Sequence, residues 1–307
     1  MENVCETLYE LIWCSKYRNV GRFYITYDEY ILENNSKRLN RLYLKNKKNY
    51  TIGDIEYIIE NSEIILLEEI KKKNKSLLNK IKMNYICSRR LIEIIKWLIK
   101  NDLKVVYMYD FINNICKYEL TEVVDWLFET NNKLLLNSYD YIYWSSMYGN
   151  VKVLNWFWDK RNIIKFTYDA RMINTASSAG YLNIIEWFWE RRNEIEFKYT
   201  EDAIDNAAQE ENIYLLEWFY NRKDQIPFIY TEWAIDISSR HGSIKIMDWF
   251  WERRNEINFL YTERAIINAF YFRRIDVILW FYNKKKDEIF RNIENIIIQY
   301  YNLFNEC

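Results

Sequence analysis

A fixed pattern of apolar and polar positions recurs through most of the chain and ends, in each copy, on a tryptophan. From Trp156 onward these tryptophans lie 31 residues apart, and the series continues toward the N-terminus at intervals of 30 and 29 residues. A constant period in this range is typical of stacked-repeat proteins, in which each copy packs only on its neighbours. The repeated tryptophans are Trp97, Trp126, Trp156, Trp187, Trp218, Trp249 and Trp280.

The segment around each tryptophan has the apolar spacing of a helix. In one copy the apolar positions are Ile244, Ile246, Met247, Trp249, Phe250 and Trp251. At ~100° per residue they cover roughly 220° of the circumference and leave a narrow polar strip. A helix that is apolar over so much of its surface is packed on its partner and on both neighbours. We therefore expect this second helix of each copy to be the inner helix of a solenoid, with its aromatic block in the core and not a cofactor-stacking platform.

A shorter first helix is expected before it. Thr231-Glu232 resembles a helix start, because a threonine hydroxyl accepts hydrogen bonds from the first free backbone amides. Small residues such as Ala234 follow and allow close approach of another helix, and Gly242 can end the helix in the left-handed conformation. We expect the same glycine turn in two other copies, and a strained or differently built turn in the four copies that lack glycine. The positions are Gly149 and Gly180, and Arg90, Glu119, Glu211 and Arg273.

Composition supports helices joined by short connections. Half of the residues are apolar, whereas there are only 5 glycines and 1 proline, too few for folds that need many tight turns. The predicted fold class is all-α, an α-solenoid of about seven helix-pair repeats of ~31 residues. We expect a divergent helical N-terminal region at 1–68, either a decayed repeat or a cap, with helices at 2–17 and 55–70. The repeat array is expected at 69–289 and a C-terminal capping helix at 290–307.

Charge and reactive residues exclude several functions. The formal net charge is −1, which gives no global attraction to nucleic acid or to an anionic membrane. The N-terminal segment lacks the basic start of a signal peptide, and no apolar run is long enough to cross a membrane. Five scattered cysteines and a single histidine offer no zinc-ligand or disulfide pattern, so we expect no metal, no cofactor and a soluble intracellular protein. The cysteines are Cys5, Cys14, Cys87, Cys116 and Cys307.

The repeat resembles a known family. The segment from Ser238 to Phe250, SSRHGSIKIMDWF, is similar to the second half of the ankyrin repeat, A-A-x-x-G-H-x-x-I-V-x-x-L-L. The variant with tryptophan after the aliphatic pair resembles ankyrin-like repeats of amoebae and of the giant DNA viruses that infect them. The likeness covers roughly residues 69–289. The T-P-L-H element is replaced by Trp233-Ala234-Ile235-Asp236, and the glycine-rich β-turn is absent, so whether β-hairpin fingers form is left open.

The resemblance implies a partner on the concave face, bound by loop tips and by the exposed side of the first helix. The matching positions differ between copies while the core positions repeat, as expected for a surface tuned to one partner. Relaxed selection on solvent-exposed positions would give the same variation. The exposed aromatics favour an interface, since aromatics and arginine are enriched at interface centres. The candidate binding residues are Tyr148, Arg171, Gln209, Glu210, Glu232, Trp233, Arg240, His241, Arg264, Tyr271 and Phe272.

The expected function is a non-catalytic, monomeric protein–protein interaction scaffold, and a viral version would engage host proteins. One alternative is an adaptor whose residues 1–68 dock on a larger machine such as a ubiquitin ligase. A second is a nucleic-acid-binding helical repeat, suggested by the basic runs Arg38–Lys48 and Lys71–Lys82, although such runs are also typical of solvated helix faces. For an enzyme we find no residues to assign, because the single histidine, His241, forms no catalytic constellation by sequence.

Overall fold

The computed structural model describes residues 50–103, 110–131, 133–135 and 137–285, and every secondary-structure element in these ranges is helical. The all-α prediction is confirmed for this part of the chain, and no β-hairpin finger occurs in it. The chain divides into two compact units, Met1–Ile81 (unit 1) and Lys82–Cys307 (unit 2). The helix expected at 2–17, the basic run 38–48 and the capping helix expected at 290–307 lie outside the described residues.

In its described part, unit 1 contains two helices that contact one another, α3 (Ile52–Glu60) and α4 (Ile64–Leu78). A capping box begins α3, in which Asp54 N donates to Thr51 Oγ1 at 3.2 Å and Thr51 N donates to Asp54 Oδ2 at 2.9 Å. The single helix expected at 55–70 is wrong, because Ser62 adopts a left-handed φ of 55° and separates the two helices. The domain boundary expected after residue 68 lies within α4.

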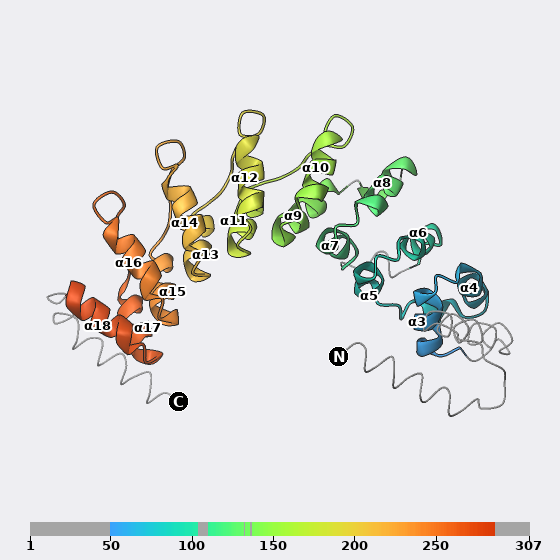
Figure 1. The fold of residues 1–307 in the computed structure, drawn as a ribbon, viewed down its shortest axis with the longest axis horizontal. Helices are drawn as coiled ribbons and strands as arrows, with labels where there is room; N and C mark the ends of the chain where they lie inside the picture. Colours follow the sequence, from blue (N-terminus) through green and yellow to red (C-terminus); the bar gives the residue numbers. More distant parts are fainter. Residues whose placement is uncertain (1–49, 104–109, 132, 136, 286–307) are drawn as a thin grey trace, which may run out of the picture. The chain divides into compact units, whose positions relative to one another are not determined.

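Unit 2 alternates first and second helices along the chain (Figure 1). The first helices are α5 (Met83–Ser88), α7 (Asp110–Lys117), α9 (Ser138–Tyr148), α11 (Arg171–Ser178), α13 (Asp202–Gln209), α15 (Trp233–His241) and α17 (Glu263–Tyr271). The second helices are α6 (Ile92–Lys100), α8 (Thr121–Glu129), α10 (Val151–Asp159), α12 (Leu182–Glu190), α14 (Ile213–Tyr220), α16 (Ile244–Glu252) and α18 (Ile275–Lys284). A 3₁₀ turn, η2 (Lys133–Leu135), follows α8. This arrangement is a helical repeat.

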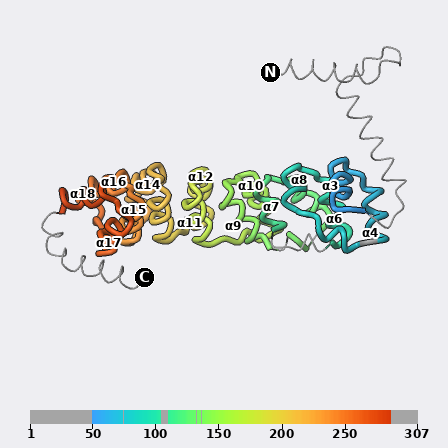
Figure 2. The backbone as a smooth tube through the Cα atoms, turned by 90° about the horizontal axis from the view of Figure 1, so that it is seen from below, coloured from blue at the N-terminus to red at the C-terminus, as the bar shows by residue number. Residues whose placement is uncertain are grey.

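Within unit 2 the first helices form one row and the second helices another (Figure 1), and the pairs follow one another in chain order along the stack (Figure 2). Each first helix packs on the next one, and this packing is closer than that within the second row. The closer-packed row lies on the inner side of a stack, so the expectation that the tryptophan-bearing helix is the inner one is wrong. Alanine and serine on the first helices, such as Ala207 and Ser239, permit the close approach, whereas aromatic rings hold the second helices further apart.

The aromatic blocks of the second helices form a ladder of rings between repeats. The ring centroids of Trp189 and Trp218 are 5.7 Å apart with an interplanar angle of 86°, and Phe197 lies 5.3 Å and 5.8 Å from them. Edge-to-face pairs at this separation are favourable beyond the area they bury. The prediction that the aromatic blocks pack in the core is confirmed for most of their rings, whereas Tyr282 at the end of the last block is 41% exposed. The same arrangement recurs at Trp158–Phe166–Trp187, Tyr220–Phe228–Trp249 and Trp251–Phe259–Trp280.

Indole N–H groups tie several second helices to the one before. Trp249 Nε1 donates to Glu217 Oε1 at 2.7 Å, and Trp280 Nε1 donates to Asp248 Oδ1 at 2.7 Å. Trp187 Nε1 makes the same bond to the amide oxygen of Asn155 at 2.6 Å. These acceptors occupy one position of the repeat, which α18 fills with Leu279.

A threonine begins the later first helices and joins them to the helix before. Thr231 Oγ1 accepts from Trp233 N at 3.1 Å, as expected of a helix start. The same threonine donates from its backbone N–H to Asp205 Oδ1 at 3.0 Å and from its hydroxyl to Asp205 Oδ2. Thr262 is held in the same way by Asp236. At Thr200 the backbone N–H donates to Asn174 Oδ1, but the hydroxyl accepts from Asn174 Nδ2. We call each such pair a staple, because it fixes one first helix to the next.

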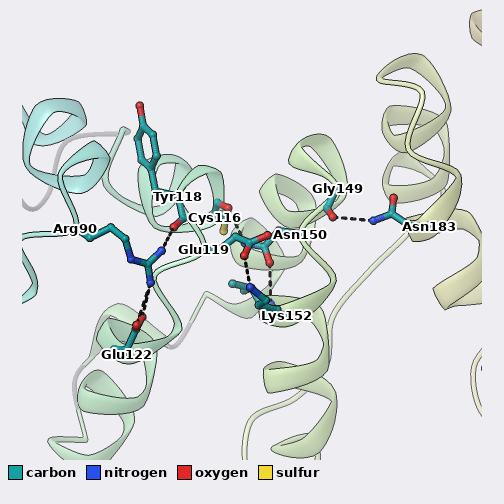
Figure 3. A network of polar contacts seen from close by, with 10 residues as sticks. Arg90, Cys116, Tyr118, Glu119, Glu122, Gly149, Asn150, Lys152 and Asn183 are labelled. Carbon is teal, nitrogen blue, oxygen red and sulfur yellow. Dashed lines mark hydrogen bonds and ion pairs between the residues drawn. The ribbon is translucent and has the colours of Figure 1, made fainter. Parts of the chain in front are cut away.

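All seven turns between the first and second helices of unit 2 have a left-handed residue at the same position. Gly149, Gly180 and Gly242 have φ of 70°, 80° and 86°, and the four residues without glycine at this position have φ between 52° and 55°. Of the two alternatives expected for those copies, the strained turn is the one observed, because a left-handed φ is unfavourable for residues other than glycine. At three of these turns the side chain contacts the next repeat, and at one of the three Glu211 accepts from the Ser243 hydroxyl. Arg90 donates to Tyr118 O and to Glu122 Oε1, both at 2.9 Å, and Glu119 accepts from Lys152 Nζ at 2.6 Å (Figure 3).

Candidate interaction surface along the first helices

The predicted binding residues lie at the two ends of the first helices and do not form one cluster. On α15, Trp233 and Arg240 are separated by seven residues, which is about 10 Å along a helix at 1.5 Å per residue. We call the two rows the N-terminal edge and the C-terminal edge. The N-terminal edge contains Arg171, Glu232, Trp233 and Arg264; the C-terminal edge contains Tyr148, Gln209, Glu210, Arg240, His241, Tyr271 and Phe272.

The C-terminal edge brings three of the predicted residues together where α15 and α17 end. The guanidinium carbon of Arg240 lies 4.8 Å from the ring centroid of Phe272, and the rings of Phe272 and Tyr271 meet edge-on at 4.9 Å and 73°. Tyr271 is 49% exposed and Phe272 is 37% exposed, and Arg240 is exposed beside them. Neighbouring large rings that are exposed to this extent are typical of a contact surface.

Two arginines that complete this end of the edge were missed by the sequence analysis as binding residues. Arg273 follows Phe272 in the left-handed turn, and Arg274 Nε donates to Arg240 O at 2.9 Å. The available signal was their position, directly after the aromatic pair and in slots that hold Glu211 and Asn212 two copies earlier.

Tyr148, Gln209 and Glu210, further along the C-terminal edge, are bonded to neighbouring side chains. Tyr148 is half-buried, its hydroxyl donates to Asn113 Oδ1 at 2.9 Å, and its ring stacks on Trp144 at 6.0 Å. Gln209 Nε2 donates to Glu210 Oε1 at 3.1 Å. These contacts hold the side chains in place and leave the end near α17 as the most accessible aromatic part of this edge.

The N-terminal edge is built from charged side chains around one exposed ring. Arg171 NH2 donates to Asp169 Oδ2 at 2.7 Å, and this hydrogen bond holds the pKa of the Asp169 carboxyl below its usual range. Arg171 also lies 5.0 Å over the ring of Tyr139. Trp233 is 46% exposed at the start of α15. The matching slots of the neighbouring copies hold Asp202 and Arg264, so Trp233 is an apolar exception in a charged row.

Two carboxylates lie beneath the surface between the edges. Burial raises the pKa of Asp205 to about 6, against the hydrogen bonds from Thr231 that lower it, and burial raises the pKa of Asp236 as well. Both side chains are occupied by the staples described above. Their role is to orient the next first helix, and no nucleophile or base is positioned against them by the hydrogen bonds of the described residues.

The cysteines and the histidine of the described residues are two buried thiols and one exposed imidazole. Burial raises the pKa of the Cys87 and Cys116 thiols to about 12, which strongly disfavours the thiolate that a nucleophile or metal ligand requires. His241 is exposed at the end of α15. No group of three histidine, cysteine, aspartate or glutamate side chains among the described residues could hold a metal ion.

The fold defines the class of this protein as an all-helical repeat protein. No protein-family model matches the chain, and no curated protein matches its sequence. Each helix in the described ranges is too short or too polar to cross a membrane.

Proposed function

We propose that the chain is a non-catalytic protein–protein interaction scaffold, built as about seven ankyrin-like copies, that binds its partner along the two edges of the first-helix row. The observation that carries the proposal is the placement of Trp233, Tyr271 and Phe272. The ladder rings of the same two copies, such as Trp249, Phe250 and Phe281, are buried, whereas these three are exposed at the ends of first helices. Exposed aromatics beside arginine are the groups that contribute most to binding at interfaces.

The pairing of apolar core and variable edges supports the same function. Core positions such as Phe219 and Phe250 repeat and are buried, so they preserve the stack. Edge positions change from copy to copy, from Gln209-Glu210 to Arg240-His241 and Tyr271-Phe272. A repeat whose core is constant can vary these edges without loss of stability, which is how solenoids acquire partner specificity.

The test is an affinity capture with the purified full chain from an amoebal cell lysate, because the repeat resembles those of amoeba-infecting giant viruses. The capture is run with and without nuclease and read by mass spectrometry. We expect one or two protein species that persist after nuclease and are lost with Trp233→Ala, Arg240→Ala and Tyr271→Ala combined. The matched control is Tyr214→Ala, which removes an aromatic that is 84% exposed on the second helix α14.

Recovery dominated by nucleic acid that nuclease removes would overturn the scaffold proposal. It would also be overturned if the triple variant retained the same protein species as the wild type. Loss of capture with Tyr214→Ala alone would place the partner on the second helices instead.

A further inference from the structure

The C-terminal edge carries unpaired positive charge at one end. Elsewhere in unit 2, many cations near the surface are matched by carboxylates, as in Arg90–Glu122 at 2.9 Å, Lys152–Glu119 at 2.6 Å and Arg253–Glu217 at 2.6 Å. Among the described residues, no carboxylate forms an ion pair with Arg240, Arg273 or Arg274. Arg240 lies in the last turn of α15, and Arg273 and Arg274 follow the end of α17. All three are beside the exposed rings of Tyr271 and Phe272.

Two of the arginines are held in place without being neutralised. Arg240 lies over the Phe272 ring at 4.8 Å, and Arg274 Nε donates to the carbonyl of Arg240 at 2.9 Å. Arg274 also packs over the turn of the copy before it, since a Cβ added to Gly242 would lie 3.2 Å from Arg274 Cδ. A guanidinium fixed by stacking or by one hydrogen bond still has free N–H groups, and it loses less entropy on binding a carboxylate than a mobile lysine does.

The charge reverses toward α13 on the same edge. The slots of Arg240, Phe272 and Arg273 hold Gln209, Glu210 and Glu211 there, and Glu211 is bonded to the Ser243 hydroxyl. An acidic segment is therefore attracted at α15 and α17 and repelled at α13. Complementary and opposing charges along one row favour a single register of a bound chain.

We propose that the end of the C-terminal edge formed by Arg240, Tyr271, Phe272, Arg273 and Arg274 is a docking site for an acidic linear segment of a partner protein that carries an apolar or aromatic residue. Carboxylates of the segment pair with the three guanidinium groups, and its apolar side chain packs on the two exposed rings. This docking site rests on the scaffold function proposed above, and its residues define the chemistry of the partner segment. The observation that favours a peptide over a nucleic acid is the net charge of −1 on the whole chain, since phosphate backbones are attracted by extended positive fields.

The probe is a library of random 12-residue peptides displayed on phage and selected on the immobilised full chain. We expect the selected peptides to be enriched in aspartate and glutamate around an apolar or aromatic residue. The patch variant combines Arg240→Gln, Arg273→Glu and Arg274→Asn, and each new residue is the one that this chain itself uses one or two copies earlier (Gln209, Glu211 and Asn212). The left-handed turn is preserved, because Glu211 adopts a φ of 55° in the same slot.

The expected result is a loss of affinity for the selected peptides by about tenfold or more in the patch variant. The control is Lys72→Glu with Lys75→Glu on α4, which changes the net charge by the same amount at exposed positions of unit 1 and should retain binding. Circular dichroism of both variants checks that the helices remain.

Selected peptides without acidic residues, peptides that bind the patch variant as well as the wild type, or an absence of any selection on the wild type would each overturn the inference. A fluorescent twelve-nucleotide oligothymidylate that binds the wild type and not the patch variant would also overturn it, in favour of nucleic acid. If a lysate protein is captured by the patch variant and lost with Trp233→Ala, the scaffold function stands and only this docking site fails.

Discussion

The first two helix pairs of unit 2, α5–α8, and the central pairs, α11–α16, have the same backbone plan and different means of joining neighbours. The central pairs are joined by the aromatic ladder and by the staples of Asn174, Asp205 and Asp236, whose side chains are buried. The first pairs are joined at their turns by exposed side chains, such as Arg90 with Glu122, which are 50% and 54% exposed. On top of the packing of first helices that both regions share, the central pairs add buried contacts between copies and the first pairs add exposed ones.

The difference lies in the segment that leads into each first helix. In the central pairs this segment contains an aromatic, a second aromatic and the threonine of the staple, as in Phe228, Tyr230 and Thr231. The rings cover the second helix, and Tyr230 lies 4.7 Å from Phe250. Buried contacts of this kind are insensitive to salt, whereas exposed ion pairs are screened. The central pairs should thus be the more stable part of unit 2.

The largest expected effect comes from removing a ring of the ladder. Phe250 is fully buried between Tyr230 and Trp249, at 4.7 Å and 4.9 Å, and Phe250→Ala should lower the free energy of unfolding by about 4 kcal/mol. The matching position in the first pairs is Leu98, and Leu98→Ala should lower it by about 3 kcal/mol, since a smaller side chain without ring contacts is lost. Urea unfolding measures both. An equal or larger loss at Leu98 would mean that the ladder adds nothing to the stability of the central pairs.

The next effect concerns two glycine turns, Gly149 in the pair between the two regions and Gly180 within the central pairs. A Cβ at Gly149 would lie 2.5 Å from Tyr181 Cδ1, and the residue has φ of 70°, so Gly149→Ala should cost about 2–3 kcal/mol through strain and overlap. At Gly180 the nearest atom is Asn212 Nδ2 at 3.2 Å, so Gly180→Ala should cost only about 1 kcal/mol, mainly from the left-handed backbone. Thermal unfolding of the two variants compares them. Equal melting temperatures would show that the overlap with Tyr181 is relieved by rotation of the ring.

A smaller, pH-dependent effect comes from the staples. Asp205 has a folded-state pKa of about 6, raised above its ordinary value by burial, so its favourable contribution is present at low pH and is lost as pH rises through about 6. Asp205→Asn should therefore raise the stability at pH 7 by about 1 kcal/mol, allowing for solvent screening, and should have little effect at pH 4.

The staple at Asn174 provides the matched test of this reasoning. Its amide donates to Thr200 Oγ1 at 2.7 Å and accepts from Thr200 N at 3.1 Å, so asparagine satisfies the same position without a charge. Asn174→Asp should introduce the pH dependence that Asp205→Asn removes, as measured by urea unfolding between pH 4 and pH 7. If Asp205→Asn changes stability equally at both pH values, the charge of Asp205 is not what burial disfavours.

The smallest effect is expected in the first pairs. Glu122→Gln removes the charge that pairs with Arg90 and should cost about 0.5 kcal/mol at low salt and nothing measurable in about 1 M NaCl, because the pair is exposed. Urea unfolding at the two salt concentrations checks this. A cost that persists at high salt would show that the hydrogen-bond geometry at Glu122 matters more than its charge.

The helical repeat, the threonine starts and the glycine turns followed from sequence because each depends on local chemistry or on the period. Which of the two rows of helices is the inner one did not follow from sequence. A strongly apolar second helix indicates burial, but which row is closer-packed depends on the difference in size between side chains such as Ala207 and Trp218 across separate copies. The choice between a strained and a differently built turn at Arg90 and Glu119 also needed the structure, which gives both residues the left-handed φ that glycine has in the other copies.

The candidate surface was only partly predictable for the same reason. Variable slots indicated which positions face solvent, and Arg240, Tyr271 and Phe272 do meet. The candidate residues separate into two edges because they lie at opposite ends of the first helices. A pattern of variable positions does not show where these helices begin and end. The hydrogen bonds that the buried carboxylates of Asp205 and Asp236 accept come from threonines 26 residues later in the chain, and a pair so far apart leaves no local pattern in the sequence.

The hydrogen bond from an indole to the preceding second helix gives the stack a direction, because each such helix presents a donor toward the copy before it and an acceptor toward the copy after it. An additional 31-residue copy inserted between α14 and α15 would have a hydrogen-bond partner on each side, with Glu217 as acceptor before it and Trp249 as donor after it. The same copy placed after α18 would bring an indole to Leu279, whose side chain has no oxygen to accept it and is 54% exposed. Inserted copies can therefore continue the series of indole hydrogen bonds, whereas the last described helix presents an exposed apolar side chain where the acceptor would lie.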